Sequence, residues 1–317
     1  MTKVAVTRQL FSEEIDPLRE RYDVALWDSD LPPSPPELLG LLEGASGALI
    51  LLTDRIDGAV LDSLPELRVV SNLAVGFDNI DVPEATRRQV AVCTTPDVLT
   101  ETTAEFTMAL LFAAAKQVIP GYQAARNGEW DTWYPMKFLG IDLNSATLGV
   151  IGYGRIGRHV ATLASAIGMK VVISDPATDS QDYENLTLED LLKRSDVVSL
   201  HTPLNNATRH LINADRLNLM KDDAILINTA RGAVVNTDAL VESLAAGRLR
   251  AAALDVTDPE PLLSDHPLYG FNNVIITPHI ASATVATRRE MARLAVANVI
   301  AVLEGTEPPH CLNPEVL

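Results

Sequence analysis

The chain has 317 residues, enough for two domains or one large one, and 47% of them are apolar, which argues against disorder. Its 42 acidic residues outnumber its 25 basic ones, giving a formal net charge of −17. This charge argues against a nucleic-acid surface and against an anionic membrane as partner, so an anionic ligand must meet local positive charge.

The two cysteines, Cys93 and Cys311, show no spacing typical of a metal or redox motif. So few cysteines in a chain of this length indicate a reducing compartment. The chain begins with residues that read as a strand, and no signal peptide is visible. The most apolar helical run, residues 106–115, is too short to span a bilayer. We therefore expect a cytoplasmic protein with no metal, membrane or nucleic-acid partner.

In the first third of the chain, short apolar runs typical of buried strands alternate with segments of helical character. This alternation predicts a small parallel α/β unit. We expect its strands at residues 4–6, 24–27, 47–52, 67–71 and 90–93, and its first helices at residues 13–21 and from Pro36 onward.

The loop after the fourth of these strands, residues 72–78, contains Gly76. Ligands of open parallel sheets bind beyond the carboxyl ends of the strands, so the backbone N–H groups of this loop are candidates for holding an anion. An ordinary turn explains the same residues, and the residues alone leave both interpretations open.

A long helix is predicted at residues 100–116, with Thr100 or Thr102 as its N-terminal cap. From Phe106 onward it is apolar on nearly every side, which predicts burial all round and a possible contact with another subunit. The next stretch is rich in aromatic residues: Trp130, Trp133, Tyr134 and Phe138. Two explanations are equally open: the loop packs against its own domain, or it forms part of a subunit interface.

A dinucleotide-binding fingerprint begins near the middle of the chain. A short buried strand, residues 147–151, leads into Gly152, Gly154 and Gly157, and a helix-like run follows. The first glycine allows a tight turn, the second lets the backbone approach a pyrophosphate, and the third lets the helix pack on the strand. The helix N-terminus offers free N–H groups to phosphate. A second strand ends at Asp175, an acid that suits the ribose hydroxyls.

Four more strands are predicted after Asp175, at residues 196–200, 224–228, 251–254 and 274–277. Six strands with helices between them make a doubly wound Rossmann sheet. A polar residue follows each of the four strand ends, where the ligand crevice of such a sheet lies: Thr202, Arg231, Asp255 and His279.

The last helix, about residues 284–304, is longer than a connector requires. We expect the segment after it, 308–317, to return to the first domain and complete it. The predicted domains are a discontinuous substrate domain, residues 1–98 and 287–317, and a dinucleotide-binding Rossmann domain, residues 99–286, with the site in the cleft between them.

Three side chains are candidates for the chemistry beside a nicotinamide cofactor, which supplies hydride. Arg231 is permanently charged and can fork onto a carboxylate or keto oxygen. His279 offers an imidazole, a side chain that can hold or release a proton at physiological pH, which suits a proton donor to a developing alkoxide. Glu260 lies in a stiff loop between prolines, and its carboxylate would favour the protonated ring and fix its tautomer. Each alone has an ordinary structural explanation, but together at one crevice they favour catalysis.

Four motifs resemble those of the D-2-hydroxyacid dehydrogenase family, and the resemblance extends over essentially the whole chain. The motifs are Gly-Tyr-Gly-Arg-Ile-Gly (152–157), Asn-Thr-Ala-Arg-Gly (228–232), Leu-Asp-Val-Thr-Asp-Pro-Glu-Pro-Leu (254–262) and Pro-His-Ile-Ala-Ser-Ala-Thr (278–284). The resemblance implies a Rossmann domain plus a smaller flavodoxin-like α/β domain. It also implies NAD(P)-dependent reduction of a small 2-keto acid to the D-2-hydroxy acid, with Arg231 binding substrate, His279 as acid/base and Glu260 as its partner.

Two further segments, residues 73–81 and Trp-Asp-Thr-Trp (130–133), resemble the glyoxylate/hydroxypyruvate reductase branch of that family. The branch implies a homodimer in which Trp133 reaches the neighbouring subunit's substrate pocket, while backbone groups of Val75 and Gly76 hold the substrate carboxylate. The predicted substrate contacts also include Arg231, His279, Ser282 and Arg288. The predicted cofactor contacts are Thr103, Gly152, Gly154, Arg155, Ile156, Gly157, Asp175, Thr202, Pro203, Thr229, Ala230, Arg231, Asp255, His279 and Ala281.

Residues 174–178 carry no basic side chain, whereas NADP-using members of the family have basic residues there. We therefore expect NAD(H) to be preferred over NADP(H). Smaller departures from the family pattern are Tyr153 in place of Leu and Ala281 in place of a frequent Gly. The alternatives that stay open are a D-lactate dehydrogenase, which fits less well, a phosphoglycerate dehydrogenase without a regulatory extension, and a non-catalytic NAD-sensing protein on the same fold.

Overall fold

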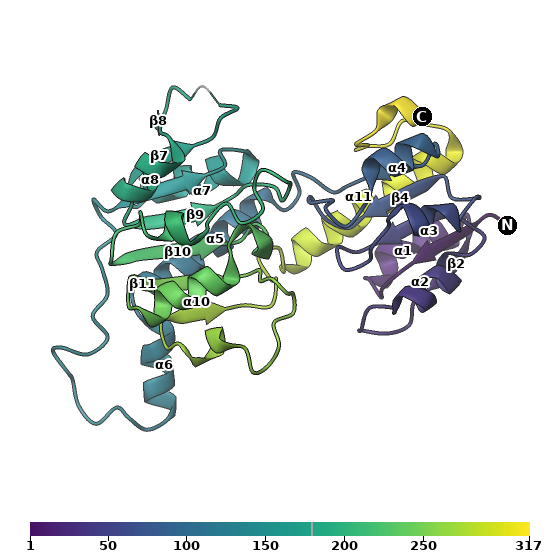
Figure 1. The fold of residues 1–317 in the computed structure, drawn as a ribbon. Helices are drawn as coiled ribbons and strands as arrows, with labels where there is room; N and C mark the ends of the chain where they lie inside the picture. Colours follow the sequence, from purple (N-terminus) through teal and green to yellow (C-terminus); the bar gives the residue numbers. More distant parts are fainter. Residues whose placement is uncertain (179) are drawn as a thin grey trace. The chain divides into compact units, whose positions relative to one another are not determined.

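The chain folds into two compact units. In the computed structural model, which describes residues 1–178 and 180–317, unit 1 comprises Met1–Leu99 and Thr284–Leu317, and unit 2 comprises Thr100–Ala283 (Figure 1). Unit 1 is therefore built from both ends of the chain, and unit 2 is inserted into it. These boundaries lie a few residues from the domain boundaries expected above, and the assignment of unit 1 to the substrate stays a prediction.

Unit 1 contains a five-stranded parallel sheet in the order β2-β1-β3-β4-β5. This is the strand order of flavodoxin-like folds, so the smaller α/β domain expected from the sequence is confirmed. Most strand residues are buried, as expected for a parallel sheet covered on both faces. The strands are β1 (Lys3–Val6), β2 (Asp23–Leu26), β3 (Ala45–Ile50), β4 (Val69–Asn72) and β5 (Ala91–Cys93).

Three helices of unit 1 begin where a polar side chain accepts hydrogen bonds from the free N–H groups of the first turn. Asp57, Asp81 and Thr284 each do so for the helix that follows. The helices are α1 (Ser12–Arg19), α2 (Pro35–Leu42), α3 (Gly58–Asp62), α4 (Val82–Arg87) and α11 (Val285–Glu304), with a short 3-10 turn, η3 (Pro314–Val316), near the end.

Helix α11 and the segment after it join the C-terminal part of the chain to the rest of unit 1. The helix packs across β3 and β4. Its Arg293 donates from Nε to Oε2 of the buried Glu14 on α1, at 2.8 Å. The following residues, 308–317, run beside β5, where the N–H of Leu312 donates to the carbonyl of Val92 at 2.8 Å. The C-terminal segment thus belongs to unit 1.

Unit 2 contains a parallel sheet in the order β12-β11-β10-β9-β6-β7-β8. The strand order reverses at β6 and β9, which is the switch point of a doubly wound Rossmann sheet. The strands are β6 (Thr147–Ile151), β7 (Lys170–Ser174), β8 (Glu184–Asn185), β9 (Val197–Leu200), β10 (Ala224–Asn228), β11 (Leu249–Leu254) and β12 (Val274–Ile276). The Rossmann domain expected from the sequence is confirmed.

This sheet has one strand more than the six expected. The additional strand, β8, pairs with β7 at the edge of the sheet. Its two residues, Glu184 and Asn185, are polar and exposed. They therefore lack the apolar alternation by which a strand is recognised in a sequence.

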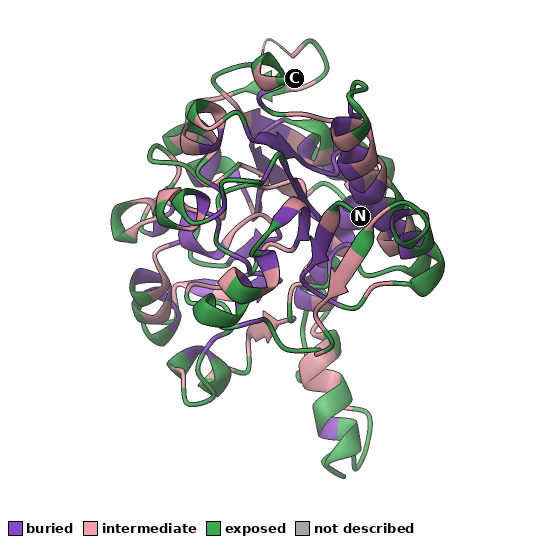
Figure 2. Cartoon of the chain, turned by 90° about the vertical axis from the view of Figure 1, so that its right-hand side faces the viewer, coloured by how far each residue is buried: buried purple, intermediate pink, exposed green. Residues whose placement is uncertain are grey.

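Helices pack on the unit 2 sheet, and two apolar clusters lie between the helices and the strands. Figure 2 shows the buried residues of the chain in purple. The helices are α5 (Thr100–Ala115), α6 (Val118–Arg126), α7 (Arg155–Ala166), α8 (Leu188–Arg194), α9 (Ala214–Leu217) and α10 (Thr237–Ala245), with 3-10 turns η1 (Gly232–Val234) and η2 (Pro267–Gly270). In the part of the chain that the structure describes, no helix combines the length and apolarity needed to cross a membrane.

Two expectations for α5 are wrong. The helix begins at Thr100, so Thr100 and Thr102 both lie inside it and neither is its N-terminal cap. The helix is also not buried on every side, because Phe112 is 41% exposed and Glu105 and Ala109 on the same stripe are exposed as well. One stripe of α5, which includes the apolar Ala109 and Phe112, therefore faces outward in a single chain.

Helix α6 and the aromatic loop after it extend away from the sheet of unit 2 (Figures 1 and 2). Within that loop Trp130 and Trp133 are 74% and 81% exposed. Of the two explanations left open by the sequence, packing against the loop's own domain is therefore not what the structure shows.

Candidate active site

The turn after β6 has the shape that a dinucleotide requires. Gly152 has a φ of +89°, and a Cβ there would lie 2.7 Å from the backbone of His201. A Cβ on Gly157 would lie 2.1 Å from the carbonyl oxygen of Gly152, so only glycine lets α7 begin this close to β6. A Cβ on Gly154 would meet none of the described atoms within 4 Å. The turn is therefore closed on its protein side and open at Gly154, where backbone approaches a phosphate.

Asp175 lies directly after β7 and is linked to this turn. Its Oδ2 accepts a hydrogen bond from the N–H of Tyr153 at 2.7 Å, and its Oδ1 accepts one from the N–H of Ala177 at 2.8 Å. The carboxylate is therefore fixed at the carboxyl edge of the sheet. Tyr153, which replaces the usual Leu, packs edge-on against Tyr183 and lies below the guanidinium of Arg158.

The other strand ends of unit 2 supply polar groups along the same edge. The hydroxyl of Thr202, after β9, is buried and has no hydrogen-bond partner among the described residues. The hydroxyl of Thr229, after β10, lies 2.9 Å from that of Thr107 on α5. A buried hydroxyl without a partner costs free energy unless a ligand satisfies it. Together with the open glycine turn, it fits a bound dinucleotide.

Arg231 is positioned by the strand end that precedes it. The side chain of Asn228, the last residue of β10, accepts from the N–H of Ala230 at 3.0 Å and donates to the carbonyl of Arg231 at 2.8 Å. The following residue, Gly232, has no room for a side chain, because a Cβ would lie 1.9 Å from the carbonyl oxygen of Thr257. The half-buried Arg231 therefore starts from a fixed backbone.

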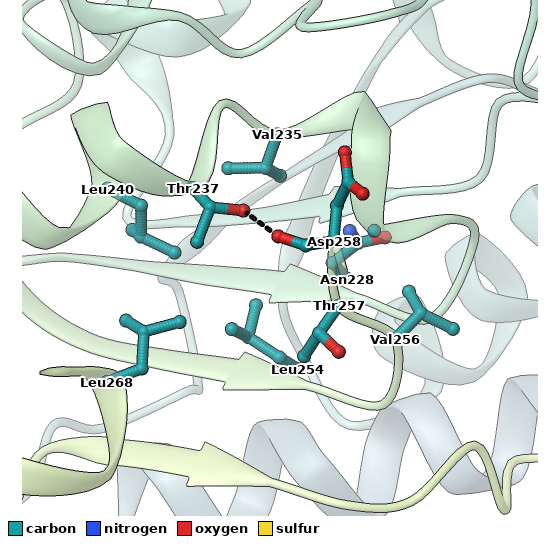
Figure 3. A pocket seen from close by; sticks show the side chains of 10 residues that line it. Asn228, Val235, Thr237, Leu240, Leu254, Val256, Thr257, Asp258 and Leu268 are labelled. Carbon is teal, nitrogen blue, oxygen red and sulfur yellow. Dashed lines mark hydrogen bonds between the residues drawn. The ribbon is translucent and has the colours of Figure 1, made fainter. Parts of the chain in front are cut away.

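The loop that carries Glu260 is held by one hydrogen bond within the loop and by another from helix α10. Within it, the hydroxyl of Thr257 donates to the carbonyl of Pro259 at 2.8 Å. From outside, the hydroxyl of Thr237 on α10 donates to the carbonyl of Asp258 at 2.9 Å (Figure 3). The small cavity beneath, with a volume of about 10 Å³, has room for roughly one water molecule, so it is a packing gap and not a substrate pocket.

His279 lies in a turn that Asp255 organises. Asp255 is buried, and its carboxylate accepts from the hydroxyl of Thr277 at 2.6 Å and from the N–H groups of Ile280 and Ala281 at 2.9 and 2.8 Å. Its carbonyl accepts from the N–H of His279 at 2.9 Å. His279 has a φ of +54°, a conformation that L-residues seldom adopt and that this set of bonds holds.

The imidazole of His279 meets the carboxylate of Glu260 at 2.6 Å, between Nδ1 and Oε1. Both side chains are partly exposed, at 25% and 34%, so a substrate can reach them. Because Nδ1 faces the carboxylate, Nε2 is the ring nitrogen left for a further partner. Another histidine of unit 2 is unsuited to proton transfer, because burial lowers the pKa of His201 to about 3. The pair therefore has the geometry of an oriented acid/base.

The loop predicted to hold the substrate carboxylate is part of unit 1. The amide of Asn72 donates to the carbonyl of Gly76 at 2.9 Å and to Oδ1 of Asn79 at 3.1 Å. The amide of Asn79 in turn donates to the carbonyl of Leu51 at 3.2 Å. These two side chains hold both ends of the loop around Val75.

The structure brings Glu260 and His279 into contact, and it places the predicted cofactor residues of unit 2 at or near one sheet edge. Among them, Thr103 is buried in α5, Arg155 and Ile156 form the first turn of α7, and Ala281 is buried in the His279 turn. Of the predicted substrate contacts, Ser282 is buried in unit 2, Val75, Gly76 and Arg288 belong to unit 1, and Trp133 is exposed on the loop after α6. Their individual roles stay predictions.

Some residues that organise the site carry no prediction from the sequence. Asn228 and Thr237 hold the segments of Arg231 and Glu260, and Asn72 and Asn79 hold the loop around Gly76. The sequence predicts Asp255 as a cofactor contact, and in the structure Asp255 also holds the His279 turn through its hydrogen bonds to the N–H groups of Ile280 and Ala281. Such supporting residues could have been recognised in the sequence as Asn or Asp at the end of a predicted strand, because these short polar side chains often form hydrogen bonds with nearby backbone groups.

Comparison with known proteins places this geometry in a family. The model of the D-isomer specific 2-hydroxyacid dehydrogenase NAD-binding domain matches residues 108–281. A glyoxylate reductase from Aeropyrum pernix is 47% identical over 324 aligned positions, which cover 99% of this chain and 97% of that protein. A crystal structure of a protein from Thermus thermophilus has a TM-score of 0.94 and 49% identity, covering 98% of this chain and 100% of that one.

A further solved structure, the NADPH-dependent glyoxylate/hydroxypyruvate reductase of Sinorhizobium meliloti in complex with NADP and malonate, has a TM-score of 0.87 at 28% identity. It covers 99% of this chain and 97% of that one. The chain belongs to the D-isomer specific 2-hydroxyacid dehydrogenase family. It is therefore a nicotinamide-dependent oxidoreductase whose unit 2 carries the cofactor-binding fold.

Proposed function

We propose that this protein reduces glyoxylate, and with it hydroxypyruvate, to the corresponding 2-hydroxy acid with NADH as the reductant. The observation that carries the proposal is the contact of 2.6 Å between His279 Nδ1 and Glu260 Oε1 at the carboxyl edge of the Rossmann sheet. A histidine fixed by a carboxylate, beside a dinucleotide turn, supplies the proton that a keto group needs when it receives hydride.

His279, Glu260 and Arg231 have different roles in the proposed reaction. A nicotinamide cofactor held at the glycine turn and Asp175 would supply the hydride for the keto carbon. The protonated ring of His279 donates its Nε2 proton to the oxygen that becomes the hydroxyl, and the carboxylate of Glu260 stabilises the charged ring until then. Arg231 binds the anionic substrate, since a planar guanidinium can hold two oxygens at once and local positive charge is needed on a chain of net charge −17.

The preference for NADH over NADPH is part of the proposal and is supported by Asp175. Its carboxylate can accept hydrogen bonds from the ribose 2′-hydroxyl and would repel a 2′-phosphate. Residues 174–180 contain no Arg or Lys to offset that repulsion. The Sinorhizobium meliloti relative is NADPH-dependent, so the family allows both cofactors and the choice rests on residues of this kind.

The remaining substrate contacts are proposed by likeness to the reductase branch. The backbone N–H groups of Val75 and Gly76 hold the carboxylate, and Ser282 and Arg288 line the same ligand. The hydrogen bonds of Asn72 and Asn79 hold this loop. They support a role of the loop in carboxylate binding, because N–H donors are best oriented by a rigid backbone before the ligand binds.

We also propose that the protein works in the cytoplasm as a two-fold symmetric homodimer. Large apolar side chains are exposed on the outward stripe of α5, at Phe112, and on the loop after α6, at Trp130 and Trp133. Exposed large apolar side chains that lie together are typical of interaction surfaces. Trp is enriched at the centres of interfaces. In this arrangement Trp133 shapes the substrate pocket of the partner.

The test is a steady-state assay of glyoxylate, hydroxypyruvate, pyruvate and phenylpyruvate, each with NADH and with NADPH. We expect the highest kcat/KM for glyoxylate or hydroxypyruvate with NADH. Turnover that is highest with phenylpyruvate would contradict the proposed substrate class. Tight NADH binding without turnover of any keto acid would contradict catalysis and favour a NAD-sensing protein.

A further inference from the structure

The only two cysteines of the chain, far apart in the sequence, lie opposite each other in unit 1. Cys93 is the last residue of β5 and is buried, and Cys311 is a half-buried residue of the C-terminal segment. The two residues form an antiparallel bridge, one from the chain before unit 2 and one from the chain after it. Nothing in the proposed reduction uses either thiol.

The backbone pairing places the two side chains on the same side of the bridge. The N–H of Leu312 donates to the carbonyl of Val92 at 2.8 Å, so the hydrogen bond joins the residues that flank the cysteines. The cysteines themselves are then a non-hydrogen-bonded pair, the kind in which opposed side chains come closest. The Cα separation of such pairs, about 4.5 Å, falls within the range that a disulfide spans.

Two buried asparagines fix this register from both sides. Asn313 accepts at Oδ1 from the N–H of Val92 at 2.8 Å and donates from Nδ2 to the carbonyl of Val90 at 2.9 Å. Asn298 on α11 donates to the carbonyl of Thr94 at 3.1 Å and accepts from the N–H of His310 at 3.0 Å. The strand and the segment are thus clamped on each side of the cysteine pair, which keeps the two sulfurs opposed.

The two thiols differ in reactivity. The side-chain hydrogen bond that Cys311 shares with Cys93, together with backbone hydrogen bonds at Asn313 and Val92, lowers the pKa of the Cys311 thiol to about 7. As a thiol, Cys311 donates from Sγ to Oδ1 of Asn313 at 3.4 Å. The hydrogen bond between the two cysteines, together with burial, raises the pKa of Cys93. A thiolate is the nucleophile in cysteine chemistry, and Cys311 is also the more accessible of the two.

We propose that Cys311 and Cys93 form a reversible redox pair in which a hydroperoxide oxidises Cys311 and Cys93 resolves it to a disulfide. The Cys311 thiolate attacks one peroxide oxygen, the O–O bond breaks, and the leaving hydroxide takes a proton, which gives a sulfenic acid and water. The sulfur of Cys93 then attacks the sulfenic sulfur, and its proton leaves with the departing hydroxyl as a second water. Two thiols and one hydrogen peroxide thus yield one disulfide and two waters.

The bond would fasten the last segment of the chain to β5 and so close unit 1 covalently. Because unit 2 is inserted between the two cysteines, the closed loop is long, and a long loop removes much freedom from the unfolded chain. The oxidised protein is therefore more resistant to unfolding than the reduced protein, and a thiol reductant reverses the effect.

The experiment treats the purified protein with a small excess of hydrogen peroxide and measures the intact mass, free thiols and thermal unfolding. We expect the mass to fall by that of two hydrogen atoms, both thiols to disappear, and the unfolding midpoint to rise by about 5 °C or more. Dithiothreitol should restore the original values. The reaction rate should rise about tenfold between pH 6 and pH 8 and then level off, as the thiolate fraction of a group titrating near 7 does.

Two single variants separate the roles. In Cys93→Ala, Cys311 should still react, gaining the mass of one oxygen as a sulfenic acid that dimedone traps, and its pH midpoint should rise because the hydrogen bond with Cys93 is gone. In Cys311→Ser, Cys93 should keep its thiol. The proposal is overturned if the parent protein keeps two titratable thiols under peroxide, if it gains oxygen without losing two hydrogens, or if the disulfide forms between chains.

Discussion

The Nδ1 atom of His279 lies 2.6 Å from Oε1 of Glu260, on two loops that follow neighbouring strands of the Rossmann sheet. The carboxylate stabilises the imidazolium ring, which is the form that gives up a proton during reduction. In Glu260→Gln the charge is lost while the shape is kept. We therefore expect the pH profile of keto-acid reduction to shift so that activity fails at lower pH than in the parent.

The measurement is kcat/KM for glyoxylate between pH 5 and 9, with Glu66→Gln, an exposed carboxylate of unit 1, as control. The control should follow the parent profile. An unshifted profile in Glu260→Gln would remove Glu260 from its assigned role, even if the overall rate fell.

A substitution of Arg231 tests which side chain binds the negatively charged substrate. Arg231→Lys keeps the positive charge but replaces a planar fork by a single point donor. We expect a large rise in KM for the keto acid and little change in KM for NADH. Arg126→Lys, on the exposed face of α6, should change neither. A rise confined to the KM for NADH would mean that Arg231 serves the cofactor.

Asp175 tests the cofactor preference. Asp175→Ala removes the repulsion of a 2′-phosphate and also the two hydrogen bonds to the N–H groups of Tyr153 and Ala177. We expect kcat/KM with NADH to fall and the ratio of NADH to NADPH to narrow by at least about tenfold, the equivalent of about 1.4 kcal/mol. Asp182→Ala, an exposed acid of the same region, is the control. Equal kcat/KM with the two cofactors in the parent protein would refute the preference.

Trp133 tests the shared site. In the proposed dimer, Trp133→Ala enlarges the partner's pocket, so the kcat/KM ratio of glyoxylate to phenylpyruvate should fall while NADH affinity is kept. Trp130→Ala removes an indole of similar exposure from the same loop and should leave that ratio unchanged. Light scattering at assay concentration supplies the second readout, because a fully active monomer is incompatible with a pocket completed by the partner.

Much of the site can be predicted from the sequence, because its glycines and charged residues are recognised from the short motifs around them. Gly152 and Gly157 each occupy a position where the structure leaves no room for a Cβ, and Gly154 leaves the turn open. The pairing of Glu260 with His279 follows from two strand ends that lie side by side. The two sheets followed from the spacing of apolar runs, whose burial the structure confirms.

The features that escaped prediction depend on contacts between distant residues or on polar pairing. Strand β8 is held by backbone bonds to β7 and has no apolar pattern of its own. The open stripe of α5 around Phe112 cannot be told from a buried one by composition. The opposition of Cys93 and Cys311 arises only when the C-terminal segment returns to β5, so their spacing in the sequence gave no sign of it.

The most direct test is His279→Ala, because reduction of the keto acid requires a proton donor and His279 is assigned that part. NADH binding, followed by fluorescence titration, and kcat for glyoxylate are measured on the variant and on His159→Ala, a histidine on α7 with no assigned role. We expect kcat of His279→Ala to fall by about 10²–10⁴-fold with the Kd for NADH nearly unchanged, and His159→Ala to match the parent. A variant that keeps more than about a tenth of the parent kcat would contradict general acid catalysis by His279.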